Sequence, residues 1–168
     1  MGKRVMIFTG KFKRLVILCF LVALVISVYL VIYGWNGAIN EYYGFRQAQT
    51  AISAFYMVQN GISFDYITPV LGPPWSIPFE FPSYQMVVAT LVSVTDLPLD
   101  QAGRWVSVIS FYLCIFPIYS LSRLAGLEKD KALLVLAVFI SSPLYIFWSR
   151  TFMIESIALL FFLKFLIF

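Results

Sequence analysis

Three long segments that consist almost entirely of apolar residues constrain the fold of this chain most strongly. They lie at residues 15–34, 102–122 and 132–148, and each is within the about 17–25 residues that a helix needs to cross a bilayer. The chain as a whole is 61% apolar and only 12% charged, a composition that is incompatible with a soluble core of this size. We therefore predict an all-α integral membrane protein.

A fourth apolar segment occupies residues 155–168 and reaches the last residue of the chain. It has no polar tail that would end a helix in the membrane interface. We therefore expect about four transmembrane helices, of which the fourth is truncated. We also expect the chain to be the N-terminal part of a longer protein.

The positions of the basic residues indicate the orientation of the chain. Five of them precede the first segment within residues 1–14, and three more lie in the charged turn at residues 123–131. Because Lys and Arg collect on cytoplasmic loops, we place both regions in the cytoplasm, and residues 35–101 and 149–154 outside. No small-x-small cleavage site precedes Trp35, so we expect the first segment to be retained as an anchor in the cell membrane.

The large outer loop is predicted to contain two juxtamembrane helices. Apolar residues recur at helical spacing from Phe45 to Val58, and Gly61 follows as a stop, which predicts a surface helix at about 45–60. A second apolar segment at about 82–95 is too short to span the bilayer. If it crossed, the cations of the charged turn would face outside. An amphipathic lid without a catalytic role remains an alternative for the first helix.

Composition excludes several classes of function. The chain has no histidine, so it has neither a histidine-ligated zinc site nor a histidine general base. Cys19 and Cys114 both lie in apolar segments, which argues against a disulfide framework. The basic residues form no motif typical of nucleic-acid binding. No cofactor is certain: no dense acidic cluster favours a metal, although a divalent metal held by carboxylates stays open.

The outer loop holds five of the eight acidic residues and is therefore where we expect the functional site. The planar guanidinium of Arg46 suits a phosphate group. Glu80 lies between two phenylalanines, where desolvation disfavours its charged form unless a cation compensates. The predicted topology puts Arg150 and Glu155 on the same outer face, although they could instead only cap their helices and pair with each other. The candidate site residues are Glu41, Arg46, Gln47, Asp65, Glu80, Arg150 and Glu155.

Four short motifs follow one another in a specific order along the chain. They are Phe45-Arg46-Gln47-Ala48-Gln49-Thr50-Ala51, Phe79-Glu80-Phe81-Pro82 followed by Tyr84, Gly103-Arg104 at the start of the second span, and Thr151-Phe152-Met153-Ile154-Glu155 at the start of the fourth. In this order and spacing, the chain after residue 14 resembles the membrane glycosyltransferases of the GT-C fold. This superfamily includes the protein O-mannosyltransferases and the lipid A aminoarabinose transferases.

The resemblance implies an enzyme that transfers a sugar from a polyprenyl-phosphate donor to an acceptor on the extracytoplasmic face. The acceptor would be a lipid, a glycan or a protein. In such enzymes an acidic residue of the first loop is usually the base or orienter of the acceptor. By position Glu41 is the candidate here, with Asp65 and Glu80 as rivals. Glu155 matches an acidic residue of the next outer loop and would orient the acceptor or the donor.

The chain departs from this family in two places. The family's common Asp-Glu pair is absent, and Arg46-Gln47 stands near where it would align. Relatives of the aminoarabinose type carry a lysine just before the loop proline to meet the donor phosphate, whereas this chain has Phe81. Arg46 or Arg150, or the C-terminal part that we expect to be missing, would therefore have to supply that positive charge. We count Arg46, Gln47, Asp65, Glu80 and Arg150 as the substrate-binding candidates.

A different class of function stays open: a non-catalytic transporter subunit or assembly scaffold whose outer loop binds a partner. A transporter would place polar residues near the middle of the membrane, whereas the spans hold little beyond scattered serines and Lys164. A scaffold would tolerate the removal of the loop charges.

Overall fold

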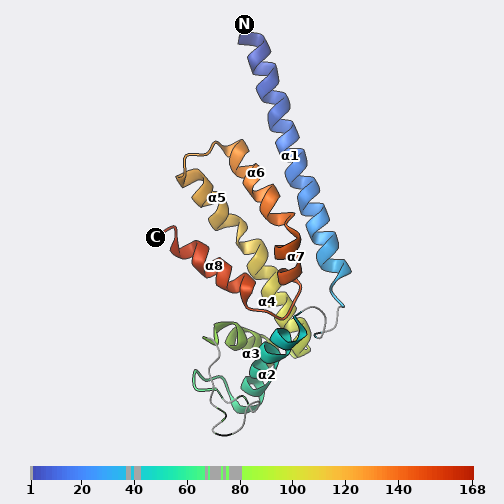
Figure 1. Cartoon of the computed structure of the whole chain (residues 1–168), viewed down its shortest axis with the longest axis vertical. Coiled ribbons are helices and arrows are strands. Elements are labelled where there is room, and N and C mark those ends of the chain that lie inside the picture. The colour runs from blue at the N-terminus through green and yellow to red at the C-terminus, as the bar shows by residue number, and fades with distance from the viewer. Residues whose placement is uncertain are drawn as a thin grey trace.

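The computed structural model describes residues 2–36, 39, 43–66, 68, 73, 75 and 81–168, with side chains from residue 10 onward. This part of the chain contains eight α-helices and no strand (Figure 1). The helices are α1 (Gly2–Tyr33), α2 (Gly44–Asn60), α3 (Ser83–Thr95), α4 (Leu99–Leu113), α5 (Ile115–Leu124), α6 (Lys129–Ile140), α7 (Pro143–Ser149) and α8 (Glu155–Phe165). The prediction of an all-α chain is confirmed for these residues.

Two helical stretches are long and apolar enough to cross a membrane. One is the 24-residue stretch Gly10–Tyr33 of α1, and the other is the 26-residue stretch Leu99–Leu124 that α4 and α5 form together. A third is present if α6 and α7, which are bent by 63°, are counted as one span. The predicted fourth span, 155–168, forms the 11-residue helix α8, shorter than the about 20 residues that crossing requires. The described residues thus show two or three candidate spans, whereas four were predicted.

The break between α6 and α7 has a local cause in the sequence. Pro143 occupies the first turn of α7, where its missing N–H removes no hydrogen bond within the helix. Ser142 precedes it with an extended backbone, at φ −66° and ψ 119°, because the proline ring disfavours the helical region for the residue before it. The segment 132–148, predicted as one continuous span, is therefore interrupted after Ser141.

The helices form a bundle, and the loop helices lie across one of its ends (Figure 1). α1 packs along α6 and α7, α4 packs against α8, and α5 packs against α6. α2 and α3 pack against each other and against α4, at the end of the bundle where α1 and α7 finish. The start of α1 and the turn between α5 and α6 lie toward the other end. This is the arrangement that the predicted topology requires, while the orientation in a membrane stays a prediction.

The two loop helices begin and end within one residue of their predicted bounds. Gly61 follows α2 with φ 97° and donates its N–H to the carbonyl oxygen of Met57 at 3.1 Å. Such a positive φ favours glycine, which has no Cβ to clash. α3 ends at Asp96, which adopts the left-handed conformation with φ 56°. Both helices thus end where a residue suited to positive φ follows them.

Close packing joins the loop helices to the bundle. Ala51 of α2 and Ala102 of α4 are buried in one cluster together with Phe152, which follows α7. The ring of Phe152 lies directly against Gly103, where an added Cβ would overlap it. Phe152 is fully buried, so its ring cannot swing into solvent to make room. The absence of a side chain at Gly103 therefore lets the segment after α7 pack on α4.

The first prediction concerns this contact. Alanine normally favours a helix over glycine by about 1 kcal/mol, but at Gly103 its Cβ would overlap the Phe152 ring. We expect Gly103→Ala to lower the free energy of unfolding by about 1–3 kcal/mol, as overpacking does in closed cores. The measurement is thermal unfolding of the purified protein in detergent.

Gly10→Ala is the matched control, because Gly10 is also helical and an added Cβ there meets nothing within 4 Å. We expect its unfolding temperature to be equal to or above that of the wild type. Equal stability of the two variants would show that Phe152 does not pack on Gly103 as described.

Candidate functional site

Buried polar groups gather where the loop helices meet the bundle. We call this region the junction: the first turns of α2 and α3, residues 100–107 of α4, the end of α1, and residues 150–154 between α7 and α8 (Figure 1). Residues 150–154 are not helical, so their peptide groups need other hydrogen-bond partners once they are removed from water. Side chains from α2 and α4 provide those partners, as follows.

Arg104 on α4 is the most buried charged side chain of the junction, with an exposed fraction of 2%. Its Nε donates to both carboxylate oxygens of Asp100, one turn earlier, at 3.2 Å each. Its Nη1 donates to the carbonyl oxygen of Arg150 at 2.6 Å and to that of Gly34 at 3.5 Å. A buried guanidinium is tolerated only with such compensation. Arg104 therefore ties α4 to the end of α1 and to the segment after α7.

Tyr84 and Ser107 form a second buried pair. The Tyr84 hydroxyl donates to the carbonyl oxygen of Gly103 at 2.8 Å and lies 3.0 Å from Ser107 Oγ. Ser107 Oγ is in turn within donating distance of the carbonyl oxygens of Thr151, at 2.9 Å, and Met153, at 3.2 Å. Burial raises the pKa of the Tyr84 phenol far above its usual range, and nearby carboxylates, that of Glu155 among them, add to the shift. The phenol therefore stays protonated and acts as a donor.

Gln47 on α2 supplies the third connection. Its exposed fraction is 1%, and its Oε1 accepts the backbone N–H of Phe152 at 3.1 Å. We predicted a substrate-binding role for Gln47, but the structure places its carbonyl oxygen on the backbone of the protein. Gln47 therefore holds the 150–154 segment in place.

Arg150 and Glu155 lie at the two ends of this fixed segment. Arg150 follows α7, and its guanidinium carbon lies 5.8 Å from the centre of the Phe147 ring. The guanidinium also lies over Gly34, where an added Cβ would overlap it. Glu155 is the first residue of α8, where the helix dipole favours a negative charge. Its Oε2 is buried while the residue as a whole is partly exposed.

The two residues do not pair with each other. The ion pairs of the described residues are Arg104 with Asp100 and Lys131 with Glu128, and Arg150 has no carboxylate within 4 Å among them. Arg150 instead lines a groove of about 240 Å³ between α1 and α7. Its other lining residues are Leu30, Tyr33, Pro143, Ile146 and Phe147. The Arg150 side chain thus forms part of the wall of this groove.

The remaining predicted residues fall in different places. Arg46 is partly exposed in the first turn of α2, close to the junction. Asp65 is exposed and follows the opposite end of α2. A helix of 17 residues is about 25 Å long, so Asp65 is not brought together with Arg150 and Glu155. Glu41 and Glu80 lie outside the described residues, and their roles stay predictions.

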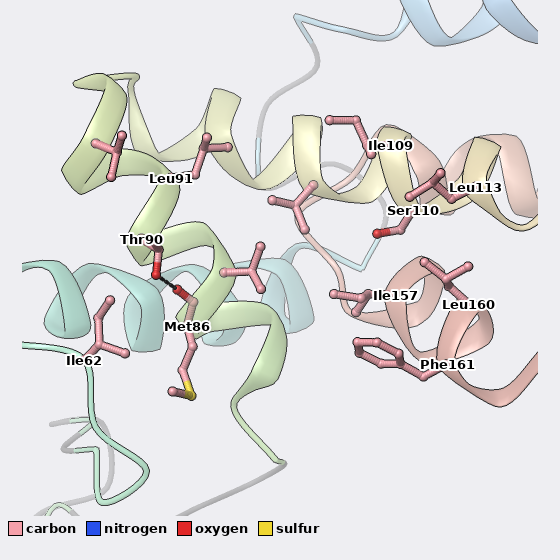
Figure 2. A pocket seen from close by; sticks show the side chains of 13 residues that line it. Ile62, Met86, Thr90, Leu91, Ile109, Ser110, Leu113, Ile157, Leu160 and Phe161 are labelled. Carbon is pink, nitrogen blue, oxygen red and sulfur yellow. Dashed lines mark hydrogen bonds between the residues drawn. The ribbon is translucent and has the colours of Figure 1, made fainter. Parts of the chain in front are cut away.

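An apolar groove of about 660 Å³ opens between α3, α4 and α8. Figure 2 shows Met86 and Leu91 of α3 on one side, Ile109 and Leu113 of α4 on another, and Leu160 and Phe161 of α8 on the third. Its few polar groups include Thr90, whose hydroxyl donates back to the carbonyl oxygen of Met86 at 2.8 Å. The groove therefore offers an apolar chain a surface almost without competing polar atoms.

Residues of the junction that sequence reasoning did not assign to the site are Asp100, Arg104, Tyr84 and Ser107. The spacing of Asp100 and Arg104, four residues apart at the start of a span, is a signal for an ion pair on one helix face. No group of three or more metal-ligating side chains occurs in the part of the chain that the structure describes.

The second prediction concerns Gln47. In Gln47→Leu the side chain keeps its approximate volume, but the buried N–H of Phe152 loses its acceptor. An unsatisfied buried donor costs about 1–3 kcal/mol, so we expect a lower unfolding temperature and faster hydrogen exchange at residues 150–154. Gln59→Leu, at an exposed position near the end of α2, is the control and should leave both unchanged. Unchanged exchange in Gln47→Leu would contradict the connection.

Comparisons with known proteins do not extend this description. A scan against protein-family models, a search of characterised proteins and a search of solved structures each found no match.

Proposed function

We propose that the protein is a membrane glycosyltransferase of the GT-C type. It transfers a sugar from a polyprenyl-phosphate donor to an acceptor on the extracytoplasmic face. The observation that carries this proposal is the junction, where buried hydrogen bonds hold the 150–154 segment. Arg150 begins this segment and has no carboxylate within 4 Å among the described residues, and the carboxylate of Glu155 follows the segment. Both side chains lie beside the loop helices, at one end of the bundle.

The chemistry of sugar transfer needs these two types of residue. The acceptor nucleophile displaces a lipid phosphate from the anomeric carbon, so negative charge develops on the departing phosphate. A cation held at that point stabilises the transition state, and the Arg150 guanidinium, whose planar fork matches a phosphate, would do so. Glu155 would orient the acceptor or donor, and Glu41 remains the candidate base for the acceptor.

The groove between α3, α4 and α8 supports a lipid-linked donor. A polyprenyl carrier has a long apolar chain that needs an apolar surface next to the reacting phosphate. The groove contains Ile157, which lies within the first turn of α8 after Glu155. A chain in the groove would therefore place its head group near the junction.

The runner-up is a scaffold or transporter subunit whose outer loop binds a partner. Several aromatic side chains next to the loop helices are strongly exposed, among them Phe45 at 82% and Phe81 at 71%. Such residues suit a protein partner as well as the membrane interface. Removing charges from the junction separates the two functions, because an enzyme would lose sugar transfer whereas a scaffold would tolerate the change.

The third prediction tests the catalytic proposal. Arg150→Gln removes the cation that would meet the departing phosphate, and Glu155→Gln removes the carboxylate at the start of α8. We expect each to lower kcat/KM for sugar transfer by about 100-fold or more, the usual cost of losing one electrostatic contact to a transition state. The measurement is transfer of radiolabelled sugar from polyprenyl-phosphate donors in membranes at matched expression.

Matched controls for these variants lie at the other end of the bundle. Arg123→Gln and Glu128→Gln make the same chemical changes at exposed positions, where an ion pair contributes little. We expect both to keep wild-type transfer. Full activity of Arg150→Gln and Glu155→Gln would exclude the junction as the reaction site.

The fourth prediction concerns the lipid chain. Leu113→Trp narrows the groove between α3, α4 and α8. We expect it to raise the KM of long-chain polyprenyl donors about tenfold, equivalent to losing roughly two buried methylene groups. The KM of short-chain donors should change less. Val138→Trp, at an exposed position on α6, is the control. An equal rise for long and short donors in Leu113→Trp would place the lipid chain elsewhere.

A further inference from the structure

The buried guanidinium of Arg104 contacts three separate parts of the chain at once. It is held by Asp100 in its own helix and donates to the carbonyl oxygens of Gly34, at the end of α1, and Arg150, after α7. Its exposed fraction of 2% leaves no face for a ligand. Arg104 is therefore not a binding cation itself, and its effect on any ligand must pass through the residues that it holds.

The contact with Arg150 is the shortest of these hydrogen bonds, at 2.6 Å. Charge-assisted hydrogen bonds of this length are about twice as strong as neutral ones. The bond fixes the peptide group of Arg150 itself. Gly34 and Phe147 fix the end of the Arg150 side chain, because its guanidinium lies over the glycine and against the aromatic ring.

Asp100 determines the direction in which Arg104 donates. Both of its carboxylate oxygens accept from Nε, and this leaves Nη1 facing the carbonyl oxygens of Gly34 and Arg150. The five donors of a guanidinium have a fixed planar geometry, whereas a lysine ammonium is a compact point charge. A lysine at position 104 would keep the positive charge but could not make both sets of contacts in this geometry.

We propose that Arg104, oriented by Asp100, is a positioning residue that sets where the Arg150 guanidinium lies in the groove between α1 and α7. The proposal rests on the proposed function, in which Arg150 meets the donor phosphate. Arg104 does not touch the donor, and it acts on donor binding only through the peptide group of Arg150.

The fifth prediction is a coupling between Arg104 and Arg150 in the KM for the donor. In an otherwise wild-type background we expect Arg104→Gln to raise the donor KM about tenfold, which is about 1.4 kcal/mol. In the Arg150→Gln background the same change should raise it by less than about twofold, because residues in one network are not additive. General damage to the fold would instead affect both backgrounds equally.

Arg104→Lys is a second variant that tests the proposal even if Arg104→Gln fails to fold. Because it keeps the charge beside Asp100, we expect its unfolding temperature to stay closer to that of the wild type than that of Arg104→Gln. Its donor KM should nevertheless rise, because the guanidinium fork is lost. A wild-type KM in Arg104→Lys would overturn the proposal.

Hydrogen–deuterium exchange tests the same proposal without enzyme activity. We expect faster exchange at residues 150–154 in Arg104→Gln and Arg104→Lys than in the wild type. Arg123→Gln is the matched control, because Arg123 Nη1 also donates to a backbone carbonyl at 2.6 Å, that of Leu127, but at an exposed site. It should leave exchange at 150–154 unchanged.

The two proposals fail in distinguishable ways. If the wild type transfers no sugar, the proposed function is wrong, and the exchange experiment then decides alone whether Arg104 holds the Arg150 segment. Suppose instead that the wild type transfers sugar. If the KM of the double variant then rises by the product of the increases in Arg104→Gln and Arg150→Gln, Arg104 is not the positioning residue. Unchanged exchange at 150–154 would overturn the positioning role in either case.

Discussion

The hydrogen bonds of the buried Arg104 guanidinium hold one end of this protein together. Removing a charge from water costs several kcal/mol even after the protein relaxes, so Arg104 can be buried only if its acceptors are all in place. Those acceptors come from α4 itself, from the end of α1 and from the segment after α7. The burial of one side chain therefore requires three distant parts of the chain to assemble at the same point.

The other buried polar groups of the junction satisfy an irregular stretch of backbone. Buried backbone that is not helical must find hydrogen-bond partners within the protein, and residues 150–154 find them in Gln47, Arg104 and Ser107. The segment is thus rigid although it is not helical. This rigidity makes it a suitable place for residues such as Arg150 and Glu155, whose chemistry depends on fixed positions.

The loop helices could be predicted closely from sequence because local signals define them. Helical spacing of apolar residues and the following Gly61 determine α2, and the length of the apolar segment determines α3. The break between α6 and α7 was missed because hydropathy reads the whole segment as one span, although Pro143 carried the signal. The number of spans stays between two and three among the described residues, because residues 155–168, predicted as a truncated span, form the 11-residue helix α8.

The candidate site was predicted only in part. Arg150 and Glu155 were identified because charged residues are rare beside apolar spans, and the structure places both on one segment. The substrate-binding role of Gln47 stays a prediction, while its Oε1 accepts the backbone N–H of Phe152, and Asp65 lies at the far end of α2. The role of Arg104 was not predictable, because its acceptors at Gly34 and Arg150 are backbone oxygens, which no pattern of side chains encodes.

Sugar transfer by the wild-type protein is the most direct test of the proposed function. Membranes that contain the protein would be supplied with a set of radiolabelled polyprenyl-phosphate sugars, and membranes without the protein would serve as the blank. If the protein is a glycosyltransferase, label from at least one donor appears in a lipid, glycan or protein acceptor above the blank. No transfer from any donor would contradict the proposed glycosyltransferase function and favour the partner-binding function.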